Sequence, residues 1–231
     1  MHQPTTEARP SIYYQYQVFQ PWLASRHPAQ QRQQVVIVGS GPSGMVTALE
    51  LACHGVASVV LSAELQFSQG SRAICFTRRS MEILQQVGVA DRMTEGGLPW
   101  RFGNSFYRGQ RVFRMEAPHD PDDRFFPIIN VQQQYMEEYL YDACKANPLI
   151  DFRWGNKVVQ VEQQDGYARV TVDTPEGEYQ LESDWVVAAD GGRSPIRSAM
   201  ELQMEGASYE GFFVIADIRI DLQLPSELLA S

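Results

Sequence analysis

The hydrophobic pattern of the chain changes near residue 34. Residues 1–33 are rich in Gln, Pro, Thr and Ser, which predicts a flexible arm with an aromatic cluster, Tyr13–Trp22, suited to docking on the surface. Val35–Val38 is a short β-branched run, typical of a buried central strand. Apolar residues then recur at helical spacing up to His54–Gly55, where glycine marks a helix stop, and Val59–Leu61 is a second buried strand. This order predicts a parallel βαβ unit.

Downstream, two amphipathic helices are expected, over Thr77–Val87 and Asn130–Ala146. Between them, aromatic-rich runs around a Gly-Gln pair predict a hairpin over Arg101–Met115. Five more runs predict strands, of which the first three form an antiparallel meander and the fourth is buried: Lys157–Val161, Ala168–Val172, Tyr179–Leu181, Trp185–Ala189 and Phe212–Ile220. The layout is α/β: a Rossmann-type domain with antiparallel β insertions.

The turn after the first strand carries a G-x-G-x-x-G sequence that opens the first helix. Gly39 permits the tight turn, Gly41 lets a pyrophosphate approach the backbone, and Gly44 allows close packing of helix on strand. Pro42 and Ser43 begin the helix, whose free N–H groups and positive dipole end favour phosphates. In this context the sequence predicts a dinucleotide site, and a glycine turn without a ligand is the less favoured interpretation.

The acid that usually ends the second strand, where it binds the ribose hydroxyls, is missing. Ser62 occupies that position, and Glu64 is the nearest carboxylate. Either Glu64 reaches the ribose from a shifted loop, or Ser62 makes a neutral hydrogen bond, about half as strong as a charge-assisted one. A solvated loop acid is an almost equally good interpretation of Glu64.

Composition and charge limit the partners. The net charge is −9 and the cationic residues are scattered, so we expect no nucleic acid and no membrane partner. Cys53, Cys75 and Cys144 are far apart, which disfavours a disulfide framework and fits a cytoplasmic protein. The four histidines lack metal-ligand spacing, so no metal site is expected. No stretch approaches the ~20 apolar residues of a membrane span, and we expect no signal peptide.

Two later segments resemble the class A flavoprotein hydroxylases, especially the branch of the 3-(3-hydroxyphenyl)propionate and phenol hydroxylases. Residues 70–76 have the sequence GSRAICF, and the resemblance implies that Arg72 contacts the pyrophosphate region of FAD. Residues 185–197 resemble the family's Asp-Gly motif. This resemblance implies that Asp190 and Gly191 close on FAD and take part in NAD(P)H binding.

The same resemblance extends over about residues 34–221. Ser194 and Pro195 suit the N-cap and first residue of a helix after the Asp-Gly motif. The helix near residue 133 resembles the family's helix whose glutamine lies along the flavin, which implies Gln133 for that role. Residues 204–217 resemble the entry into a β-rich substrate domain. The expected organisation is an arm over 1–33, an FAD-binding domain over 34–200 with a substrate-side hairpin at about 100–128, and the beginning of a substrate domain, truncated, over 201–231.

The resemblance implies a monooxygenase that uses FAD, NAD(P)H and O₂ to hydroxylate a small phenolic aromatic substrate, and it leaves a homodimer open. The family's third motif, Gly-Asp followed by Ala-Ala-His, is not found, so we expect a fragment or a truncated product. No catalytic residue can be named. Two alternatives stay open: another flavoprotein of the same fold, such as a reductase or halogenase, and a non-catalytic remnant that binds a dinucleotide.

Overall fold

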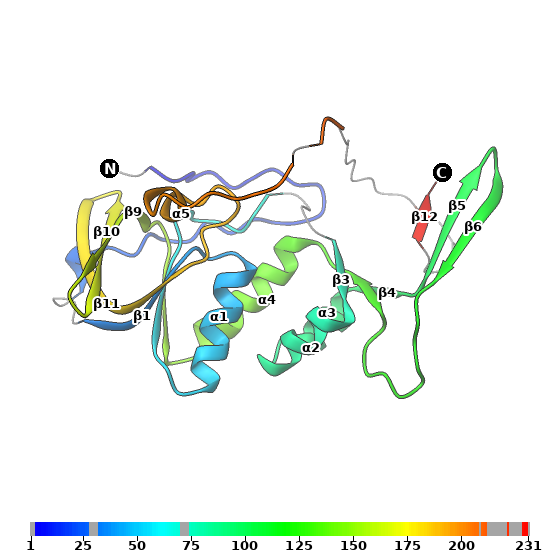
Figure 1. Cartoon of the computed structure of the whole chain (residues 1–231), viewed down its shortest axis with the longest axis horizontal. Coiled ribbons are helices and arrows are strands. Elements are labelled where there is room, and N and C mark those ends of the chain that lie inside the picture. The colour runs from blue at the N-terminus through cyan, green and yellow to red at the C-terminus, as the bar shows by residue number, and fades with distance from the viewer. Residues whose placement is uncertain are drawn as a thin grey trace.

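A computed structural model of the chain shows one main β-sheet with helices packed against it (Figure 1). The α/β class with antiparallel insertions is confirmed. The expected strand over Phe212–Ile220 and the candidate residue Arg72 lie outside the described residues. The structure describes residues 3–27, 32–69, 74–207, 209–211, 221 and 228–230.

The main sheet has six strands, and its centre is the predicted βαβ unit. β1 pairs in parallel with β2 and with β11, and β2 pairs in parallel with β8. β9, β10 and β11 form the predicted antiparallel meander at the other edge. In spatial order the strands are β8 (Ile150–Arg153), β2 (Ser58–Leu61), β1 (Gln33–Val38), β11 (Gly177–Ala188), β10 (Tyr167–Thr174) and β9 (Lys157–Gln164).

Strand β11 corrects the sequence prediction in two ways. Tyr179–Leu181 and Trp185–Ala189 were expected as separate strands, but β11 runs from residue 177 to 188 without a break and pairs first with β10 and then with β1. Trp185 was expected to be buried, but it is 73% exposed. Two residues further along the strand, Val187 is half-buried and packs against the helix core, so the exposure is local to Trp185.

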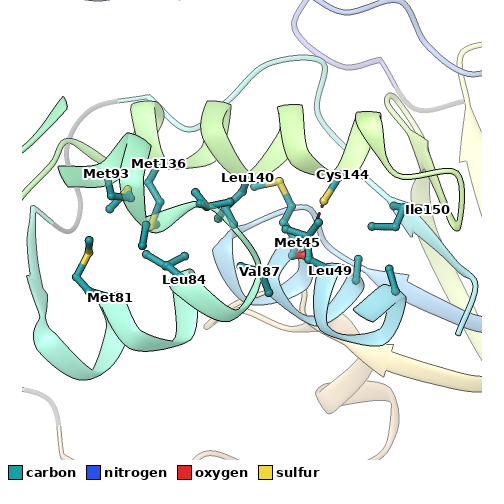
Figure 2. Close-up of a cluster of buried hydrophobic side chains, with 14 of the residues drawn as sticks. Met45, Leu49, Met81, Leu84, Val87, Met93, Met136, Leu140, Cys144 and Ile150 are labelled. Carbon is teal, nitrogen blue, oxygen red and sulfur yellow. Dashed lines mark hydrogen bonds between the residues drawn. The ribbon is translucent and has the colours of Figure 1, made fainter. Parts of the chain in front are cut away.

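Four helices share one apolar core with the sheet (Figure 2). Val35 and Ile37 of β1 face this core, whereas Val36 and Val38 face a second cluster with the meander, as the alternation of a strand requires. The helix α3 was not predicted. The helices are α1 (Pro42–Cys53), α2 (Arg78–Gln86), α3 (Ala90–Gly96) and α4 (Gln133–Ala146).

Two small sheets lie beyond the main one. The predicted hairpin is present as β5 (Phe102–Tyr107) and β6 (Gln110–Glu116), and Figure 1 shows it projecting from the body. β12 (Leu228–Ala230) pairs in parallel with β5. The remaining sheet was not predicted, because it is assembled from short strands distant in sequence: β3 (Cys75–Thr77), β7 (Ile128–Asn130) and β4 (Leu98–Trp100).

The described part of the N-terminal segment, residues 3–27, lies along the body of the protein. It contains only a short 3₁₀ turn, η1 (Ala24–Arg26). Nevertheless Tyr16 and Phe19 are buried. The ring of Phe19 stacks on Trp154, with centroids 4.3 Å apart and planes 4° apart. The aromatic cluster therefore packs into a third apolar cluster of the protein.

Candidate functional site

A cavity of about 460 Å³ lies where β1, β2 and β11 end and α1 begins. Ligands of open α/β sheets bind at the carboxyl ends of the strands, and the volume is within the usual range of ligand pockets, about 300–1,000 Å³. Nine of the eleven sequence-predicted residues line the cavity: Gly39, Gly41, Pro42, Ser43, Ser62, Glu64, Gln133, Asp190 and Gly191. Of the other two, Gly44 packs against Gly39 and is not among the lining residues, and Arg72 is outside the described residues.

The first and third glycines of the turn are required by the protein's own packing. Gly39 has a φ of +108°, and a Cβ there would lie 2.3 Å from the carbonyl oxygen of Ala189. A Cβ on Gly44 would lie 2.0 Å from the carbonyl oxygen of Gly39. Both positions therefore bring the end of β1, the start of α1 and the end of β11 into close contact, which fits the roles expected for them.

The second glycine of the turn, Gly41, is not required by the protein's own packing. Gly41 adopts a φ of −70° and a ψ of 177°, which any residue can adopt. Among the described atoms, nothing lies within 4 Å of the position of a Gly41 Cβ. Gly41 is also the N-cap of α1 and offers no side chain to cap the helix, so the N–H groups of the first turn have no side-chain partner at a point where Gly41, Pro42 and Ser43 line the cavity. This open, uncapped helix end fits the pyrophosphate of a dinucleotide.

Ser62 is in the cavity wall but is 1% exposed. Its hydroxyl accepts a hydrogen bond from Ser40 Oγ at 2.7 Å and donates one to the carbonyl oxygen of Glu64 at 3.3 Å. The backbone N–H of Ser62 donates a hydrogen bond to the carbonyl oxygen of Arg153, and its carbonyl oxygen accepts one from the backbone N–H of Asn156. The hydroxyl of Ser62 is thus engaged in holding the loop that follows β2.

Glu64 forms an ion pair with the N-terminal segment. Arg9 Nη2 lies 2.9 Å from Glu64 Oε2, and Arg9 also lines the cavity. The Arg9 side chain is 18% exposed and the Glu64 side chain 50% exposed. The Arg9 guanidinium also donates a hydrogen bond to the carbonyl oxygen of Phe67, and the Arg9 backbone N–H donates one to Gln66 Oε1 at 2.9 Å. Sequence reasoning missed Arg9, because it lies 55 residues from Glu64 and in no recognisable motif.

Gln133 begins α4 and is held by a buried acid. Its Nε2 donates to Glu137 Oε1 at 2.7 Å. Glu137 is only 3% exposed, and its carboxylate also accepts from the backbone N–H and the hydroxyl of Ser68, each at 2.7 Å. Sequence reasoning missed Glu137, which has the spacing of an ordinary helix-face charge. The structure thus places the predicted glutamine in the cavity wall with its amide fixed by a carboxylate.

Asp190 and Gly191 follow β11, which lies on the other side of β1 from β2, and both line the cavity. Asp190 Oδ2 accepts from the backbone N–H of Ile196 at 3.2 Å, at the start of α5 (Pro195–Ala199). Ser194 caps this helix by accepting from the N–H of Arg197 at 2.9 Å, as predicted from the Ser-Pro pair. Gly191 has a φ of +85°, which favours glycine. The Asp-Gly turn is therefore fixed by the helix that follows it.

The described residues also show whether the chain has the pattern of a metal site or of a membrane-spanning helix. In the described ranges, no group of three or more His, Cys, Asp or Glu side chains is arranged to hold a metal ion. Within the same residues, no helix has both the length and the apolar character needed to cross a membrane.

Comparison with known families decides the assignment. The family described as "FAD binding domain" matches residues 32–228. The chain belongs to this FAD-binding family. The para-nitrophenol 4-monooxygenase of Pseudomonas sp. is 27% identical over 196 residues, which are 82% of this chain and 48% of the relative. The 3-(3-hydroxy-phenyl)propionate/3-hydroxycinnamic acid hydroxylase 2 of Burkholderia vietnamiensis is 32% identical over 192 residues, 81% of this chain and 35% of the relative.

Solved structures agree with this FAD-binding domain. The p-nitrophenol 4-monooxygenase PnpA of Pseudomonas putida matches 77% of this chain and 46% of its own, with a TM-score of 0.73 and 27% identity. The flavin-dependent monooxygenase PieE, solved with FAD and substrate, matches 77% of this chain and 33% of its own, with a TM-score of 0.69 and 27% identity. The resemblance to class A FAD-dependent aromatic monooxygenases is confirmed. The chain spans about a third to a half of the length of these relatives.

Proposed function

We propose that the cavity binds FAD with its ADP portion over the glycine-rich turn. The observation that carries this proposal is the uncapped N-terminus of α1, with open space above Gly41 that the protein's own packing does not explain. Backbone N–H groups and the helix dipole at that point favour an anion. Gly39, Pro42, Ser43 and Gly44 shape the same cradle, so backbone N–H groups of the turn and of the first helical turn would bind the pyrophosphate.

The remaining predicted residues would hold other parts of the cofactor. We propose that Gln133, which lines the cavity and has its amide fixed by Glu137, lies beside the flavin, as the resemblance implies. We propose that Asp190 and Gly191, at the end of β11, contact the cofactor as well. Arg72 is proposed as a contact of the pyrophosphate region from resemblance alone. Each group binds or orients the cofactor and excludes water from it, and no proton transfer is assigned to any of them.

For the whole enzyme we propose hydroxylation of a phenolic aromatic compound with NAD(P)H and O₂ in the cytoplasm. When bound, FAD supplies the redox and oxygen chemistry of such a reaction. Support comes from the names of the relatives, which include a nitrophenol monooxygenase and a hydroxyphenylpropionate hydroxylase. No catalytic residue for the substrate is assigned to this chain.

A titration of the purified chain with FAD tests the cofactor proposal. Flavin fluorescence and absorbance would be followed against protein concentration, with NAD⁺ in a parallel titration by competition. We expect saturable binding of FAD and weaker binding of NAD⁺. Failure of FAD to bind a chain that is folded by circular dichroism, or tighter binding of NAD⁺ than of FAD, would contradict the proposal.

A further inference from the structure

The ribose end of the proposed site is built partly by a segment that lies before the residues matched to the family. The family match begins at residue 32, and residues 3–27, which we call the strap, lie before it. Arg9 of the strap lines the cavity and pairs with Glu64, which lies in the loop after β2. The expected acid at position 62 is replaced by a serine whose hydroxyl is buried and already bonded.

The strap is fixed to that same loop at several points. The backbone N–H of Phe19 donates to the carbonyl of Leu65 at 2.9 Å, and Tyr16 Oη donates to the carbonyl of Ser68 at 2.9 Å. Two backbone carbonyls of the strap, at Thr5 and Glu7, accept from Gln66 Nε2 at 3.1 and 2.8 Å. The strap therefore contacts the loop that carries Glu64 at every residue from 64 to 68.

Further along, the strap is anchored to β8 and the residues after it. The guanidinium carbon of Arg153 lies 3.9 Å from the centre of the Trp22 ring, and the backbone N–H of Trp22 donates to the carbonyl of Trp154 at 2.9 Å. Arg153 is itself 2% exposed and paired with Asp151 at 2.6 Å. An arginine can stack on an aromatic ring and pair with a carboxylate at the same time, so Arg153 holds Trp22 of the strap in one position against β8.

We propose that Glu64 accepts the ribose hydroxyls of the bound dinucleotide, and that the strap, through Arg9, is the device that positions it. This inference rests on the proposed FAD site. Arg9 occupies one carboxylate oxygen of Glu64, and the half-exposed side chain leaves the other oxygen to accept from a ligand. The carboxylate thus reaches the ribose from two residues past the expected position, and Arg9 is a positioning residue for it.

The hydroxyl contact can be measured with ADP and 2′-deoxy-ADP as probes. The ratio of their dissociation constants reports the contribution of the ribose 2′-hydroxyl, and it is insensitive to a general loss of affinity. A charge-assisted hydrogen bond makes this ratio about tenfold in the unaltered chain. We expect the ratio to fall close to one in Glu64→Ala and to fall in Arg9→Ala, with partial rescue by Arg9→Lys. We expect it to stay near tenfold in Ser62→Ala.

Arg26→Ala is the matched control. Arg26 is an exposed arginine of the same strap and is not among the residues of the cavity wall. It should leave both the ratio and the FAD affinity unchanged, whereas Arg9→Ala should weaken FAD about tenfold. Thermal unfolding of each variant separates a local effect from loss of the fold.

The outcomes separate this inference from the function on which it rests. If the unaltered chain binds FAD and shows no preference for ADP over its deoxy analogue, or if Glu64→Ala or Arg9→Ala keeps the preference, the strap inference is overturned and the FAD site stands. If only Ser62→Ala removes the preference, the serine is the ribose contact and the inference is again overturned. If the folded chain binds neither FAD nor ADP, both the proposed function and the inference fail.

Discussion

Replacing Gly41 by alanine should separate cofactor binding from folding. The backbone at Gly41 is extended and a Cβ there meets no described atom within 4 Å, so the substitution introduces no strain and no clash. Alanine lowers the entropy of the unfolded chain, which raises the free energy of unfolding by up to about 1 kcal/mol, but it is a poorer N-cap than glycine, which offsets this gain, so we expect little net change in the free energy of unfolding. The methyl group instead occupies the space that we assign to the pyrophosphate.

The expected loss of FAD affinity follows from the hydrogen bonds displaced. A hydrogen bond to a charged group contributes about 1.5–3 kcal/mol. Losing one of them at the Gly41 cradle costs about 2 kcal/mol, which is roughly a 30-fold rise in Kd. Flavin fluorescence titration measures the Kd of each variant, and urea denaturation of the cofactor-free protein measures its free energy of unfolding.

Gly44→Ala provides the opposite case. Its Cβ would lie 2.0 Å from the carbonyl oxygen of Gly39, so α1 must shift, and we expect the free energy of unfolding to fall by about 1–3 kcal/mol. The reasoning would be refuted if Gly41→Ala destabilised the cofactor-free protein as much as Gly44→Ala does. It would be refuted equally if Gly41→Ala bound FAD as tightly as the unaltered chain.

Three further predictions concern buried groups. Glu137→Gln should lower the free energy of unfolding by about 2 kcal/mol, because the three hydrogen bonds that the buried carboxylate accepts from Ser68 and Gln133 lose their charged acceptor. A change below about 0.5 kcal/mol in urea denaturation would count against this. Phe19→Ala should cost about 3 kcal/mol and shift the tryptophan emission, since the stacked ring is lost; an unchanged spectrum and midpoint would contradict it. Burial raises the pKa of the Cys144 thiol to about 12, so at pH 8 iodoacetamide should modify the exposed Cys53 and Cys75 and spare Cys144 until the protein unfolds. Peptide mass spectrometry measures the labelling of each cysteine, and labelling of Cys144 in the folded protein would contradict this prediction.

The βαβ unit and its glycine turn were predictable because their signals are local. A β-branched run, a glycine spacing and a helical period lie within about 30 consecutive residues, and tertiary contacts then reinforce them. The meander was predictable for the same reason, since turn residues separate its alternating strands. The continuous β11 was not, because Ser183 interrupts the apolar pattern; in the structure its hydroxyl donates to the carbonyl of Trp185 at 2.8 Å and the strand continues.

The parts of the site that sequence reasoning missed depend on contacts between distant segments. Arg9 meets Glu64 across 55 residues, and no periodicity predicts such a contact. Glu137 appears in the sequence as one of two adjacent acids on α4, and only the packing of Ser68 against it shows that it is buried. The choice between Ser62 and Glu64 was likewise open from spacing alone, because it depends on which side chain the folded loop exposes to the cavity.

The most direct test of the central claim is a competition experiment on the purified chain with bound FAD. The claim is that the glycine-rich turn and the walls around it hold the ADP portion of the cofactor. ADP should therefore displace FAD in a saturable way, and FMN, which lacks the adenylate, should displace it far less well at the same concentration. Displacement by FMN but not by ADP, or no saturable binding of FAD in the first place, would contradict the claim.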